Sequence, residues 1–255
     1  MNILELKNVK KTYKTRNVKT EALKNISFNV ENGEFISIMG ESGSGKTTLL
    51  NIIATLDKAT SGNVIINGKD INSIKENEIS KFRREKLGFV FQDFNLLDQF
   101  NNKDNILLPM VLSNSDINTM EKSLAYLKKT LNLDAIIDKY PYEVSGGQKQ
   151  KVAIARAIIT TPSLLLADEP TGALDSNSSN MILDLFTKIN GNGQTILMVT
   201  HSMMAASYSK RVLFIKDGLI FHEIYKGENE SRNEFMERIN KAQLVLGKGV
   251  NDNEY

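Results

Sequence analysis

Residues 40–48 read Gly40-Glu41-Ser42-Gly43-Ser44-Gly45-Lys46-Thr47-Thr48 and decide the fold, because they match the phosphate-binding loop pattern G-x-x-x-x-G-K-[ST] at every position. The apolar run 35–39 before them predicts a short strand. After them, the spacing of apolar residues fits one face of a helix, formed by Leu49, Ile52, Ile53 and Leu56. A strand, a loop and a helix in this order are the context that the pattern requires, so we expect a site for a nucleoside triphosphate.

The chemistry of this loop gives each residue type a role. Its glycines allow successive backbone N–H groups to surround phosphate oxygens, and the N-terminus of the following helix adds a favourable dipole. Lys46 is expected to reach the terminal phosphates, and the Thr47 hydroxyl is expected to ligate Mg²⁺. The residues expected to contact the nucleotide here are Gly40, Ser42, Gly43, Ser44, Gly45, Lys46, Thr47 and Thr48.

The composition of the chain restricts its class. Its 255 residues, 41% of them hydrophobic and 24% charged, are enough for one large domain or two small lobes. The chain has no cysteine, which excludes disulfides and thiolate metal sites. We expect no membrane span, because no apolar run approaches about 18 residues, and no secretion signal, because residues 1–7 lack an apolar core. A net charge of +2 gives no general field for nucleic acid, so none is expected as a partner.

The order of elements predicts an α/β fold. Early strands are expected over 2–13, 22–30, 63–66 and 88–91, with a polar connection at 14–20 and a turn at 67–68. From Asp93 to about Thr161 the pattern is helical, with breakers at Pro109 and Pro141 and one apolar face formed by Met120, Leu124, Leu127 and Leu131. Three continuous apolar runs follow, at 164–167, 195–199 and 212–215. Runs of this kind suit a parallel sheet covered on both faces, so we expect a nucleotide-binding core interrupted by a helical insertion.

Two carboxylates, Asp168 and Glu169, end the apolar run 164–167. In open α/β sheets, ligands bind at the carboxyl ends of the strands. Asp168 is therefore expected to hold Mg²⁺, and Glu169 to polarise a water for attack on the γ-phosphate. Two acids at a strand end can also be merely solvated, but the phosphate-binding loop favours the functional interpretation.

A second anion-binding helix start is expected at Ser145-Gly146-Gly147-Gln148. One bound nucleotide does not need two such helix starts from one subunit. A head-to-tail homodimer would use both helix starts, because each subunit would offer residues 145–148 to the γ-phosphate bound by the other. The alternative is an ordinary Ser-Gly-Gly helix cap.

The phosphate loop, the Ser-Gly-Gly-Gln run and the Asp-Glu pair resemble, in order and spacing, those of ABC-type ATPase domains, over about Ile3 to His222. The resemblance implies a P-loop NTPase fold with a RecA-like core, an antiparallel β-subdomain and a helical subdomain at about 93–161. It also implies hydrolysis of ATP with Mg²⁺ by an ATPase domain of residues 1–227.

Residues 228–255 are expected to form a C-terminal helical extension, with Ser231 and Glu234 as a capping box. Its apolar face is expected to comprise Phe235, Ile239, Ala242 and Leu246, with Gly247 closing the helix.

Four further residues obtain roles from this resemblance. Tyr13 resembles the aromatic residue that stacks on adenine, although a tyrosine on a strand surface is the alternative. Gln92 resembles the catalytic-site glutamine that contacts Mg²⁺ and water. Asp175 resembles an aspartate that acts across the dimer. His201 resembles the histidine that touches the γ-phosphate and orients the attacking water.

Members of this family without membrane helices normally drive a separate integral membrane permease. The resemblance therefore implies a cytoplasmic protein that is peripheral at the inner face of the membrane. The residues expected to line the groove for a permease helix, or alternatively to form the core of the helical lobe, are Phe94, Leu96, Leu97 and Phe100.

Details of the motifs suggest a branch of the family. Residues 55–57 and 89–92 are similar to those of lipoprotein-release, macrolide-export and cell-division ATPases, and residues 140–150 are closer to bacitracin- and lantibiotic-resistance ATPases. This implies an ATPase that powers removal or export of antimicrobial peptides, with another transport task of the same branch as the alternative. A remote alternative is a soluble ABC protein acting on DNA or ribosomes. Such proteins carry long coiled-coil insertions or two ATPase domains, and neither sign is present in the sequence.

Overall fold

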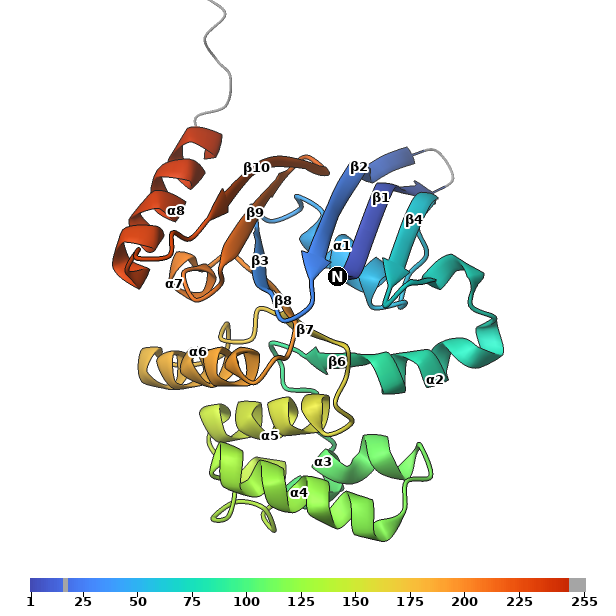
Figure 1. The fold of residues 1–255 in the computed structure, drawn as a ribbon, viewed down its shortest axis with the longest axis vertical. Helices are drawn as coiled ribbons and strands as arrows, with labels where there is room; N and C mark the ends of the chain where they lie inside the picture. The colour runs from blue at the N-terminus through green and yellow to red at the C-terminus, as the bar shows by residue number, and fades with distance from the viewer. Residues whose placement is uncertain (16–17, 248–255) are drawn as a thin grey trace, which may run out of the picture.

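The structure, a computed structural model, describes residues 1–15 and 18–247 and consists of two β-sheets with helices packed around them (Figure 1). The larger sheet contains, in spatial order, β10 (Leu219–Tyr225), β9 (Arg211–Lys216), β3 (Phe35–Met39), β8 (Ile196–Thr200), β7 (Leu164–Asp168) and β6 (Leu87–Val90). All its neighbouring strands are parallel except β10, which is antiparallel to β9. The strands β3 and β8 are buried over their whole length, so the predicted parallel sheet with both faces covered is confirmed.

The smaller sheet is antiparallel, with the order β2 (Val18–Glu31), β1 (Asn2–Thr15), β4 (Ser61–Ile66) and β5 (Lys69–Asp70). The predicted turn at Asn67-Gly68 is confirmed, since both residues have positive φ angles, of 50° and 76°. The predicted polar connection at 14–20 is wrong in its extent. Lys14 pairs with Lys19 and Thr15 with Val18, because backbone ladder bonds need no apolar side chain; residues 16–17 lie outside the described residues.

The helices are α1 (Lys46–Ile53), α2 (Glu76–Lys86), α3 (Asn102–Val111), α4 (Ile117–Leu131), α5 (Gly146–Ile158), α6 (Ser176–Gly191), α7 (Met203–Ala206) and α8 (Arg232–Gly247). Short 3₁₀ turns cover Ile71–Ser73 and Pro141–Glu143. Figure 1 shows α3, α4 and α5 gathered at one end of the molecule, beyond β6 and β7, where they form the helical lobe. Among the described residues, no helix is both long and apolar enough to span a bilayer.

Two details of the helices differ from the prediction. Leu56 does not share the buried face of α1 and is 55% exposed, because the helix ends at Ile53 and the N–H groups of Leu56 and Asp57 both turn back to the Asn51 carbonyl. Pro109 does not break α3 but lies inside it. Burial of Ile106 and Met110 on either side compensates for the hydrogen bond that proline cannot donate.

The C-terminal helix α8 is docked on the core. The predicted capping box is confirmed, since the Ser231 N–H donates to Glu234 Oε2 (2.8 Å) and the Glu234 N–H donates to Ser231 Oγ (3.3 Å). Phe235 and Ile239 are fully buried in one cluster with residues of β3, α7 and β9. Ala242 packs against the same cluster, whereas the side chain of Leu246 is outside the described part of the chain.

The parallel sheet brings distant parts of the sequence to one edge. The phosphate-binding loop follows β3, Asp168 and Glu169 lie at the end of β7, and His201 follows β8. Met39 lies opposite Thr200 and Asp168 opposite Val199 in the strand register, so these strand ends are level with one another.

The docking of α8 gives a first prediction. Phe235→Ala should lower the free energy of unfolding by about 3 kcal/mol, because it removes a fully buried ring and leaves a cavity. Leu244→Ala, on the same helix at a position 58% exposed, is the matched control and should change it by less than about 0.5 kcal/mol. Urea denaturation of both variants measures the difference; equal effects would mean that α8 does not pack on the core through Phe235.

Candidate nucleotide-binding site

One cavity of about 380 Å³ lies at the carboxyl edge of the parallel sheet. Its lining unites residues from four separate sequence motifs: Ser42, Gly43, Gly45, Lys46, Thr47, Thr48, Gln92, Asp168, Glu169 and His201, together with Ala22 and Val199. The structure thus brings together most of the loop residues that were predicted to bind phosphates, and all of those predicted to hold Mg²⁺ and to activate water.

The phosphate-binding loop has a shape that only glycine permits at two positions. Gly45 has a φ angle of 106°, and a Cβ atom there would lie 2.6 Å from the Ala22 carbonyl oxygen. A Cβ atom on Gly40 would lie 2.3 Å from the Ile215 carbonyl oxygen, so the start of the loop touches the backbone of β9. Gly40 and the buried Ser44 do not line the cavity, whereas Ser42, Gly43 and residues 45–48 do.

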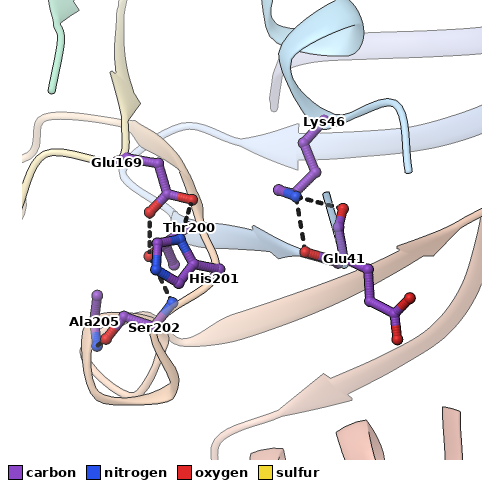
Figure 2. Close-up of polar contacts among 8 residues, drawn as sticks. Glu41, Lys46, Glu169, Thr200, His201, Ser202 and Ala205 are labelled. Atoms are coloured by element: carbon purple, nitrogen blue, oxygen red, sulfur yellow. Dashed lines mark hydrogen bonds and ion pairs between the residues drawn. The ribbon is translucent and has the colours of Figure 1, made fainter. Parts of the chain in front are cut away.

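Lys46 is the first residue of α1, and its side chain reaches back to the first residues of the phosphate-binding loop. Its Nζ donates to the carbonyl oxygens of Gly40 (2.7 Å) and Glu41 (2.8 Å), as Figure 2 shows. Burial lowers the pKa of Lys46, and the nearby charges of Glu169 and Asp168 oppose this shift. The ammonium group thus contacts the loop and is within electrostatic reach of two carboxylates.

Asp168 lies in surroundings that favour a cation. Burial raises the pKa of its carboxyl group, the neighbouring Glu169 raises it further, and Lys46 opposes the change. The oxygen-bearing side chains of Thr47 and Gln92 line the same cavity. Mg²⁺ prefers oxygen ligands, and a raised carboxylate pKa is relieved by a bound cation, so these residues fit a Mg²⁺ site.

Glu169 is held by three consecutive residues at the end of β8. Its N–H donates to the Val199 carbonyl (2.9 Å), the Thr200 hydroxyl contacts its Oε2 (3.1 Å), and His201 Nδ1 lies 2.8 Å from its Oε1. Figure 2 shows both carboxylate contacts. The φ angle of Glu169 is 45°, in the left-handed region that residues other than glycine rarely adopt. Thr200 was not predicted as a site residue; its position directly before His201 is the signal that could have identified it.

The Ser145–Gln148 run and Asp175 do not line this cavity. Ser145 caps α5, with its N–H bonded to Gln148 Oε1 (2.9 Å). A Cβ atom on Gly147 would lie 3.0 Å from Ser178 Oγ, and that hydroxyl donates to Asp175 (2.6 Å). Hydrogen bonds from Ser178 lower the pKa of Asp175. The residues predicted to act across a dimer, which include Gly146, thus form a second surface on the same chain.

Tyr13 does not line the cavity either. Its hydroxyl donates to Asp57 Oδ2 (2.8 Å), and the Lys11 ammonium lies 4.7 Å from the centre of its ring. Tyr13 as a whole is 42% exposed, so both the adenine-stacking role and the strand-surface alternative stay predictions.

The surroundings of Asp168 give a second prediction. Asp168→Asn should raise the melting temperature of the nucleotide-free chain at pH 7 by roughly 1–3 °C, because it removes a charge that the fold destabilises. The gain should shrink as the pH falls below the raised pKa of Asp168 and vanish below the ordinary pKa of an aspartate, since the carboxyl group is then neutral in both the native and the unfolded chain. Asp98→Asn, in an exposed loop, is the control; a lower melting temperature for Asp168→Asn at pH 7 would contradict the assigned electrostatics.

Comparison with known proteins agrees with this geometry. The family model described as "ABC transporter" matches residues 23–172. The ABC transporter ATP-binding protein YxdL of Bacillus subtilis is 49% identical over 98% of this chain and 97% of its own length. The bacitracin export ATP-binding protein BceA of Halalkalibacterium halodurans is 48% identical, over 99% of this chain and 100% of its own length.

A solved structure gives the same result. The ATP-binding cassette MJ0796 in a dimeric post-hydrolysis state, bound to ADP and Pi, matches with a TM-score of 0.79 and 41% identity, over 87% of this chain and 98% of its own. The matches in sequence confirm the family that the motifs resemble. The match in structure confirms the predicted combination of a P-loop core, an antiparallel β-sheet and a helical lobe. The chain belongs to the ABC transporter family.

Proposed function

We propose that this chain is the ATPase subunit of a bacterial ABC transporter that removes or expels antimicrobial peptides. Membership of the family makes the chain an ATP hydrolase that uses Mg²⁺. The observation that carries the choice of substrate class is the similarity to the bacitracin export protein BceA, which extends over the whole of both chains. The end-to-end match includes the C-terminal region as well as the ATPase motifs.

The cavity suggests how hydrolysis proceeds. The loop glycines and Lys46 bind the phosphates, and Glu169 accepts a proton from the attacking water. His201, 2.8 Å from the Glu169 carboxylate, orients that group and the water. Thr47, Gln92 and Asp168 would hold Mg²⁺, which neutralises charge on the phosphates when bound.

The second surface supports a head-to-tail homodimer. Ser145, Gly147 and Asp175 lie outside the cavity of their own chain, and we propose that they complete the cavity of another copy. Two solved structures of MJ0796 are dimeric. ATP would thus bind between two copies, and hydrolysis would release them.

A membrane permease is the proposed second partner, and it would hold the chain at the cytoplasmic face of the membrane. Leu97 and Phe100 are 39% and 40% exposed, whereas Leu96 packs into the helical lobe. A cavity of about 330 Å³ lies between the core and this lobe, and its lining includes Phe89, Phe91 and Arg156 but neither Leu97 nor Phe100. A hydrophobic helix of the permease fits such a surface.

Loss of the gene and purification of the protein test the substrate class. Deletion should increase the sensitivity of the cell to antimicrobial peptides, and the chain should purify together with a large membrane permease. Unchanged peptide sensitivity, together with failure to recover such a permease, would refute the proposed substrate class. Co-purification with a permease of a division complex would instead favour another transport task in the same branch.

The role of Glu169 gives a third prediction. Glu169→Gln should slow hydrolysis by at least about a hundredfold, because it removes the proton acceptor, while ATP still binds. Size-exclusion chromatography with and without ATP–Mg²⁺ should show an ATP-dependent shift from monomer to dimer. Near-normal turnover would refute the role given to Glu169.

The role of Lys46 gives a fourth prediction. Lys46→Ala should abolish measurable ATP binding in a fluorescent-nucleotide titration, because it removes the cation next to the phosphate-binding loop. Lys58→Ala is the matched control, since that lysine is largely exposed and lies outside the cavity. Equal ATP affinity in both variants would contradict the placement of the phosphates.

A further inference from the structure

We propose that Thr200 is a positioning residue for Glu169, whose hydroxyl aims the carboxylate at the attacking water. The inference rests on the role of Glu169 in the proposed function. It concerns a buried side chain at the end of β8 that no sequence motif singled out (Figure 2).

The direction of the Thr200 hydroxyl follows from its two contacts. Its Oγ1 accepts a hydrogen bond from the Ser202 N–H (3.0 Å) and lies 3.1 Å from Glu169 Oε2. A hydroxyl has one hydrogen to donate, and the carboxylate can only accept it. Thr200 therefore donates to Glu169, while the backbone of the following turn fixes the position of the oxygen atom.

Burial distinguishes Thr200 from the other residue that touches the carboxylate. Thr200 is fully buried, whereas the side chain of His201 is 73% exposed. His201 is also expected to contact the γ-phosphate, so its bond to Glu169 competes with a second task. Among the described residues, the Thr200 hydroxyl donates to no group other than Glu169. It is also buried away from solvent, where a hydrogen bond to a charged group is stronger.

The side chain of Glu169 needs this restraint. Its left-handed φ angle and its N–H bond to Val199 fix where the side chain begins, but the torsions of the side chain remain free to rotate. Contacts at both carboxylate oxygens remove that freedom before the reaction starts. Such preorganisation raises the rate of the chemical step without strengthening ATP binding.

Paired substitutions in the full chain test the inference. Thr200→Val keeps the branched shape and removes the hydroxyl, and Thr200→Ser keeps the hydroxyl. Thr195→Val is the matched control, because Thr195 is also buried and its hydroxyl also accepts a backbone N–H, from Gly33 (2.9 Å), near the opposite end of β8. Glu169→Gln, alone and combined with Thr200→Val, completes a double-mutant cycle.

We expect Thr200→Val to lower the kcat for ATP about tenfold, with an unchanged KM and unchanged affinity for fluorescent ATP. Thr200→Ser, which keeps the hydroxyl, should have a kcat within about twofold of that of the original chain. Thr195→Val should keep the original kcat whatever it does to the melting temperature. Adding Thr200→Val to Glu169→Gln should cause no further loss, since the two residues act as one unit.

Three results would overturn the proposal: an unchanged kcat in Thr200→Val, failure of Thr200→Ser to restore kcat when both variants are folded, or a full additional loss in the double variant. The Glu169→Gln variant alone tests the proposed role of Glu169 in hydrolysis, on which this inference rests. If Glu169→Gln alone turns over ATP normally, the role of Glu169 is wrong and the proposal for Thr200 is refuted with it.

Discussion

The register of the parallel strands is the constraint on which the rest of the structure depends. Backbone hydrogen bonds place the ends of β3, β8 and β7 level with one another, with Met39 opposite Thr200 and Asp168 opposite Val199. Every reactive group of the cavity follows one of these ends or that of β6. A shift of one strand by a single residue would send its side chains to the other face and separate the acids from the phosphate-binding loop.

Much of the cavity could be predicted from the sequence, because its residues are tied to local patterns. The loop glycines, Lys46 and the two acids each follow an apolar strand, and the strand direction alone brings them together. Where local patterns competed with packing, prediction failed. Pro109 stays helical because its neighbours are buried, and the helical spacing of Leu56 continues past the true end of α1.

Other features depend on contacts that no local pattern records. The bond between Thr200 and Glu169 joins residues 31 positions apart, and the hydroxyl of Tyr13 reaches Asp57 over 44 positions. The helical start at Ser145 was predictable from its capping residues, but its position beside Ser178 and Asp175 was not. Pairings of this kind follow from the packed sheet and lobes, after the local elements have formed.

The separation of the cavity from the surface at Ser145 and Asp175 has a genetic consequence. In a head-to-tail pair, each composite site takes its loop from one chain and its Ser-Gly-Gly-Gln run from the other. A copy with a damaged loop still carries an intact second surface, and a copy damaged at that surface still carries an intact loop. Two such copies, each inactive alone, together rebuild one complete site, so alleles of the two kinds should complement each other in one cell.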